Sequence, residues 1–210
     1  YVDIDAHHGD GVQQAFFGDD RVLTISIHES GQYLFPGTGF VKELGEGRGT
    51  GYSVNLPLYP YTNDELYLEA FNEVVPPLLR AFAPDVMVTQ LGIDTYHDDP
   101  LTHLQLTTRG FVEAVTELSQ MDIPWLALGG GGYDVMAVAR AWTLAYGVML
   151  GVDWPDKIPE SFAQQHGVCQ LRDSLTPGIP ENVRRDALRY AEQSVAELKE
   201  QVFPVHGLGS

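Results

Sequence analysis

The stretch YVDIDAHHGDG, residues 1–11, contains the strongest structural signal in the sequence. With the two-residue period of a β-strand, Asp3, Asp5 and His7 point to one face and the apolar residues between them to the other. Three such polar groups are costly to bury unless they bind a metal or one another. A turn signal at residues 9–11 follows at once. The pattern therefore predicts the carboxyl end of a strand, where α/β folds place their ligands.

Beyond residues 1–11, several short apolar runs predict further strands, and each run ends in polar or glycine-rich sequence. The expected strands are residues 1–7, 21–30, 52–58, 84–94 and 123–133. Helical periodicity predicts helices at residues 62–82, 107–121, 133–150 and 180–202. Alternating strands and helices favour an α/β fold, a three-layer αβα arrangement around a mainly parallel sheet.

Details of three helices can also be predicted. Thr62 and Glu65 have capping-box spacing, and the pair Pro76-Pro77 is expected to kink or interrupt that helix. Thr107 is a candidate cap for the next helix. Residues 133–150 are apolar almost all round, which predicts a buried helix.

Composition indicates an ordinary globular protein and excludes few functions. The 210 residues suffice for a single domain, 44% of them are hydrophobic, and the net charge is −17. Such an acidic balance argues against nucleic-acid binding, and we expect no membrane association because no apolar run reaches the length of a membrane span. The single cysteine, Cys169, excludes an intrachain disulfide and favours a cytoplasmic location.

Three candidate metal ligands follow two of the predicted strands. Asp5 and His7 end the first, and Asp94 ends the run at residues 84–94. Because the carboxyl ends of parallel strands share one rim, these side chains can meet there. Two carboxylates and an imidazole form a catalytic type of site that admits Zn²⁺, Fe²⁺ or Mn²⁺. The simpler alternative is that Asp5 caps a turn and Asp94 caps a helix.

Gly129–Gly132 and Tyr133 follow the last predicted strand. Four glycines allow close approach of a ligand, but no Lys-Ser/Thr pair follows them, so a phosphate-binding loop is disfavoured. Tyr133 either donates a hydrogen bond to a developing oxyanion at the metal rim or is a core residue.

Five motifs together resemble the histone deacetylase superfamily in order and spacing. They are YVDIDAHHGDGVQQAFF, VLTISIHESGQYLFPGTG, GYSVNLPL, QLGIDTYHDDPLTHL and LGGGGYDV. The match covers residues 1–151 and looks most like the bacterial acetoin-utilization branch. It implies an arginase/deacetylase-like fold, with residues 152–210 as a C-terminal helical extension of one catalytic domain over residues 1–210.

The resemblance also implies roles for individual residues. Asp5, His7 and Asp94 match the ligands of the catalytic zinc, and Tyr133 matches the tyrosine that binds the substrate carbonyl. Asp3 and Asp10 match carboxylates that orient a pair of catalytic histidines. The matching positions of the acyl-lysine channel are Phe35, Leu101 and Gly132. Family members bind structural K⁺ or Na⁺, at one site matching Asp3, Asp5, His7, Ser26 and Ile27 and at another matching Phe16, Asp19, Val22 and Tyr52. His8 matches a structural position.

One part of the family pattern is not found in this sequence. The paired histidines that act as general base and acid precede the DIDAHHGDG motif in the family, and His7-His8 is the one His-His pair here. We therefore expect the N-terminal part of the fold to be missing, and these 210 residues by themselves to be inactive.

The resemblance implies a zinc-dependent hydrolase, with Fe²⁺ as a second possible ion, that removes acetyl groups from acetyl-lysine in proteins. One alternative is an arginase-like ureohydrolase with two manganese ions, disfavoured because GIDTYHDDP lacks a second aspartate pair at a spacing of two. Another is a non-catalytic fragment that binds an acylated ligand. The sequence does not predict the oligomeric state.

Overall fold

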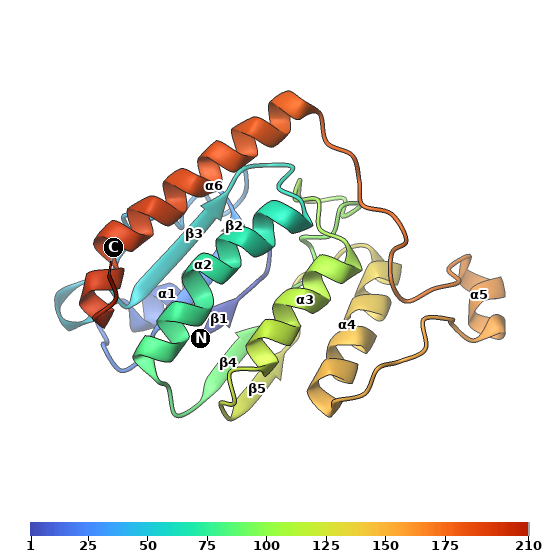
Figure 1. Ribbon diagram of the computed structural model, residues 1–210, viewed down its shortest axis with the longest axis horizontal. Coiled ribbons are helices and arrows are strands. Elements are labelled where there is room, and N and C mark those ends of the chain that lie inside the picture. Colours follow the sequence, from blue (N-terminus) through green and yellow to red (C-terminus); the bar gives the residue numbers. More distant parts are fainter. Residues whose placement is uncertain (210) are drawn as a thin grey trace.

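The computed structural model describes residues 1–209 and has a parallel β-sheet at its centre (Figure 1). Within these residues the strand order is β3-β2-β1-β4-β5, and every neighbouring pair is parallel. The strands are β1 (Val2–Asp3), β2 (Thr24–Glu29), β3 (Ser53–Leu58), β4 (Met87–Gln90) and β5 (Trp125–Leu128). The predicted mainly parallel α/β sheet is confirmed.

Four helices lie side by side over one face of the sheet (Figure 1). In spatial order they are α6 (Glu181–Gln201), α2 (Asp64–Phe82), α3 (Thr108–Ser119) and α4 (Val135–Leu150). The short α1 (Asp10–Phe16) packs near β2 on the other face, and α5 (Glu160–His166) lies apart, beyond α4. Few helical residues among those described therefore cover this other face of the sheet. Leu126 and Leu128 of β5 are exposed.

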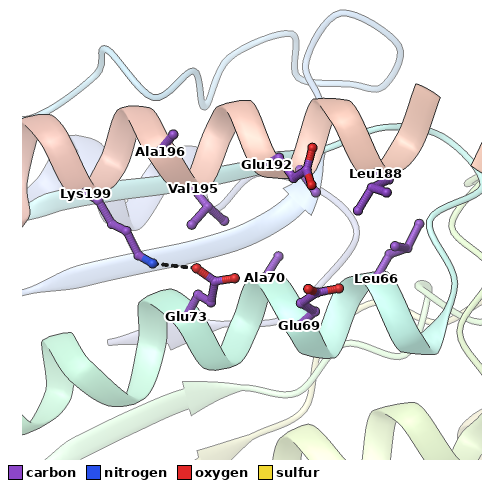
Figure 2. A pocket seen from close by; sticks show the side chains of 10 residues that line it. Leu66, Glu69, Ala70, Glu73, Leu188, Glu192, Val195, Ala196 and Lys199 are labelled. Carbon is purple, nitrogen blue, oxygen red and sulfur yellow. Dashed lines mark hydrogen bonds and ion pairs between the residues drawn. The ribbon is translucent and has the colours of Figure 1, made fainter. Parts of the chain in front are cut away.

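Helix α6 joins the core along one apolar stripe. Ala187, Ala191, Val195, Leu198 and Val202 are all buried, because they repeat on one helical face. Between α6 and α2 lies a small cavity of about 180 Å³ with an apolar floor, and Lys199 pairs with Glu73 across it (Figure 2). None of its lining residues belongs to the predicted metal site.

The local predictions about helices had different outcomes. Thr107 caps α3, since its hydroxyl accepts from the N–H groups of Arg109 and Gly110. The capping-box prediction is wrong, because Asn63 caps α2 by accepting from Leu66 N–H, while the Thr62 hydroxyl donates to the Tyr59 carbonyl.

Helix α2 also continues through Pro76-Pro77 without interruption. The carbonyls that lose their partners belong to Asn72 and Glu73, and both of these residues are exposed, so water can satisfy them. Helix α4 is buried on one face only, and Val135 is 71% exposed, so the expectation of a fully buried helix is wrong.

The connection from Gly31 to Tyr52 is a long loop with a 3₁₀ turn, η1 (Gly47–Gly49). At Gly39 this loop contacts the buried interior of the molecule. There the Gly39 carbonyl accepts a hydrogen bond from Nε2 of the fully buried His28, at 2.9 Å. A second 3₁₀ turn, η2 (Phe203–His206), ends the described fold and packs against α6 and α2.

Candidate metal centre

Asp5, His7 and Asp94 converge at the carboxyl ends of β1 and β4. One ligand atom from each lies within 4.8 Å of the others. His7 Nδ1 is 3.1 Å from Asp5 Oδ1 and 2.8 Å from Asp94 Oδ2. Both carboxylates are buried, while the His7 side chain is 23% exposed. The three groups therefore form one cluster with a side open to solvent.

The local route of the chain differs from the predicted strand over residues 1–7. Strand β1 ends at Asp3, and the chain then curls because aspartate side chains bind the backbone two residues further on. Asp3 Oδ1 accepts from Asp5 N–H at 3.0 Å, and Asp5 Oδ1 accepts from His7 N–H at 2.8 Å. Asp5 and His7 thus project from a turn, and not from the strand itself.

Hydrogen bonds from Gln90, Gly131 and Ala6 hold the two carboxylates in place. Asp5 Oδ2 accepts from Gln90 Nε2 at 2.7 Å and from Gly131 N–H at 2.8 Å. Asp94 Oδ1 accepts from Ala6 N–H at 2.7 Å. The cluster is therefore connected to β4, to the glycine run after β5 and to the turn after β1. Such outer partners fix the orientation of metal ligands.

The two carboxylates and the imidazole of the cluster strongly perturb one another's ionisation. Hydrogen bonds to Asp5 and then to Asp94 raise the pKa of His7 to about 10. Burial opposes ionisation of Asp5, but hydrogen bonds from His7 and Gln90 outweigh it and lower its pKa. Burial raises the pKa of Asp94 to about 6. Two buried carboxylates this close call for a neighbouring positive charge, and the donor set suits Zn²⁺ or Fe²⁺.

Tyr133 lies beside this cluster. The residue is 49% exposed. Burial raises the pKa of its phenol, and the charges of Asp94, Asp5 and Asp99 raise it further. Its backbone N–H donates to Asp99 Oδ2 at 2.8 Å. A phenol beside the rim is in a position to meet a ligand, so the core-residue alternative does not apply.

The three predicted channel residues lie on three loops. Leu101 is 52% exposed and donates its N–H to Asp99 Oδ1 at 2.9 Å, so Leu101 and Tyr133 share one anchor. Phe35 is 79% exposed on the loop after β2. Gly132 has φ of 151°, and a Cβ there would lie 2.8 Å from Ile93. Their grouping as an acyl channel stays a prediction.

The two predicted orienting carboxylates have different surroundings. Asp3 is buried and accepts from the Tyr1 hydroxyl at 2.9 Å, and burial raises its pKa to about 7. Asp10 is exposed at the first position of α1. His8 binds Thr38 and Gln13 through its two ring nitrogens and does not belong to the cluster, in accord with a structural role.

Some residues of the two predicted monovalent-cation sites contact one another in the fold. Asp3 and Ser26 of the first set pair in register across β1 and β2. In the second set, the Phe16 carbonyl accepts from Asp19 N–H and the Tyr52 carbonyl accepts from Thr24 N–H. The Asp19 side chain pairs with Arg21. Both sites stay predictions.

A family model described as the histone deacetylase domain matches residues 1–149. The chain belongs to the histone deacetylase family. It is 45% identical over 166 residues to the acetoin utilization protein AcuC of Bacillus subtilis, covering 76% of this chain and 43% of that protein. It is 42% identical over 159 residues to human histone deacetylase 1, covering 76% of this chain and 33% of that protein.

Solved structures of deacetylase homologues agree. An HDAC homolog complexed with SAHA aligns with a TM-score of 0.81 at 33% identity, over 91% of this chain and 56% of that one. An HDAC homolog from Aquifex aeolicus aligns with a TM-score of 0.80 at 34% identity, with the same coverage. The chain thus has the family fold but spans about half or less of the length of these relatives.

Sequence reasoning missed two polar residues of this histone deacetylase site. Gln90 binds Asp5, and Asp99 binds the backbone of Tyr133 and Leu101. A signal for Gln90 was present, since a polar side chain at the carboxyl end of a strand lies at the rim. Asp99 follows Asp98, and nothing in the sequence separates the buried aspartate from the exposed one.

Proposed function

We propose that the full-length protein is a Zn²⁺-dependent hydrolase, with Fe²⁺ as the alternative ion, that removes acetyl groups from acetyl-lysine in proteins. The observation that carries the proposal is the convergence of Asp5, His7 and Asp94 beside Tyr133. Membership of the histone deacetylase family and similarity to AcuC support this reaction.

The ligand set suits a single ion better than a pair. Among residues 1–209, Asp5, His7 and Asp94 form the one group of three or more acidic, histidine or cysteine side chains with this spacing. A binuclear ureohydrolase centre needs further carboxylates around a second ion. The geometry therefore favours a mononuclear deacetylase over the manganese alternative.

In this proposal each residue has a distinct task. Asp5, His7 and Asp94 hold the ion, and His7 coordinates through Nδ1, the nitrogen that already faces both carboxylates. A divalent ion in such a site supplies Lewis-acid chemistry, polarising a carbonyl and lowering the pKa of water. Tyr133 donates its phenolic O–H to the oxygen that becomes negative as the amide carbon turns tetrahedral.

The net reaction adds water across the amide bond, releasing acetate and a lysine amine. It needs a base for the water proton and an acid for the leaving amine. By similarity to the family, we assign both to the histidine pair that precedes the DIDAHHGDG motif in family members. His7 and His8 are engaged with the carboxylates and with Thr38 and Gln13.

The net charge of −17 is compatible with a cationic protein substrate.

The test uses the full-length protein and an acetyl-lysine peptide. We expect one zinc or iron per chain by elemental mass spectrometry, with release of acetate that disappears in Asp94→Ala. The matched control is Asp98→Ala, whose side chain is 71% exposed and lies outside the cluster. Two manganese ions per chain, or full metal content without acetate release, would contradict the proposal.

A further inference from the structure

Asp99 is a buried acidic residue to which the mechanism above gives no role. It is 6% exposed and lies on the loop that follows β4, five residues after the ligand Asp94. Its two carboxylate oxygens accept from two different backbone donors, Leu101 N–H at 2.9 Å and Tyr133 N–H at 2.8 Å. One side chain thus connects the channel mouth to the oxyanion donor.

Tyr133 needs such an anchor because of its place in the chain. It follows four glycines, a run with little conformational preference of its own. Immediately after it, Asp134 caps α4 by accepting from Met136 and Ala137 N–H groups, both at 2.9 Å. The cap fixes the helix, and Gly131 N–H, two residues before Tyr133, donates to the ligand Asp5 at 2.8 Å. At the tyrosine itself, the backbone N–H is held by Asp99.

The loop that contains Asp99 is itself held at two further points. The Thr102 hydroxyl donates to the Asp94 carbonyl. His103 contacts the buried Glu29 twice, through its backbone N–H at 2.8 Å and its Nδ1 at 2.9 Å. Asp99 therefore projects from a segment that is rigidly joined to a metal ligand, and it transmits that position to Tyr133.

We propose that Asp99 is a positioning residue that sets the placement of Tyr133 over the metal ligands and, through Leu101, the shape of the channel mouth. The inference rests on the proposed deacetylase function. Charge-assisted hydrogen bonds are short and directional, so two of them define a position well. A misplacement of about 1 Å can cost a reaction about 100-fold in rate.

The test is a double-mutant cycle in the full-length enzyme, with kcat and KM measured on an acetyl-lysine peptide. Asp99→Asn retains one acceptor oxygen but turns an NH₂ group toward the second N–H. We expect kcat to fall about 100-fold, with a smaller change in KM. In the Tyr133→Phe background, the same substitution should lower kcat less than threefold, because the oxyanion donor is already gone.

Controls separate positioning from folding. Asp98→Asn should leave kcat unchanged, and Asp99→Glu, which keeps both acceptor oxygens, should recover part of the loss. If Asp99→Asn does not fold, as judged by circular dichroism, Asp99→Glu replaces it in the cycle. Equal losses of kcat in the wild-type and Tyr133→Phe backgrounds would overturn the positioning role of Asp99 but not the proposed deacetylase function. A wild-type enzyme that releases no acetate would instead overturn the proposed function.

Discussion

Gln90→Met should weaken Zn²⁺ binding although Gln90 is not one of the predicted ligands. Its Nε2 donates to Asp5 Oδ2 at 2.7 Å, and its Oε1 accepts from Gly92 N–H at 2.6 Å. The substitution removes a hydrogen bond to a charged group, worth about 1.5–3 kcal/mol. Because Gly131 N–H still binds the same oxygen, we expect the lower part of that range, a loss of affinity of about 10- to 30-fold.

The assay is a competition titration of the metal-free chain against a chromophoric zinc chelator. Methionine is similar in length to glutamine, so the packing volume changes little. Gln193→Met, on the exposed side of α6, is the matched control and should bind as the wild type does. If Gln90→Met binds zinc within twofold of the wild type, Gln90 does not orient Asp5 for metal binding.

Three further outcomes follow from the same structure. Tyr133→Phe should lower kcat of the full-length enzyme about 100- to 1,000-fold in a peptide deacetylation assay, the typical cost of losing one oxyanion donor. Gly131→Ala should impair zinc binding in the chelator titration, because a Cβ would lie 2.8 Å from Asp5 Oδ2, whereas Gly11→Ala has open space and should not. Burial, and then the charge of His8, lower the pKa of His28 to about 3. The His28 imidazole binds a proton near pH 6.5 in the unfolded chain but not in the folded one. The free energy of unfolding therefore decreases as the pH falls below 6.5, by about 2 kcal/mol at pH 5. In urea unfolding at several pH values, the free energy of unfolding of His28→Asn should not show this decrease. An identical pH dependence of that free energy in the wild type and the variant would contradict the role given to His28.

Much of the fold was predictable because its signals are local. Apolar runs with polar ends located the strands, and the stripe from Ala187 to Val202 identified the buried face of α6. Local signals failed where a neighbour competed for the same role. Asn63 displaced Thr62 as the cap of α2, and exposed carbonyls let Pro76-Pro77 remain inside a helix.

The residue pattern alone indicated Asp5, His7 and Asp94 as candidate ligands, because the carboxyl ends of parallel strands share a rim. The tertiary structure added that their ligand atoms lie within 4.8 Å, that Gln90 donates to Asp5, and that Asp99 accepts from the backbone of Tyr133. Contacts between residues tens of positions apart depend on how strands and loops are placed in space, and no local periodicity encodes that. Asp98 and Asp99 are identical in sequence terms, and burial against Tyr133 and Leu101 alone distinguishes them.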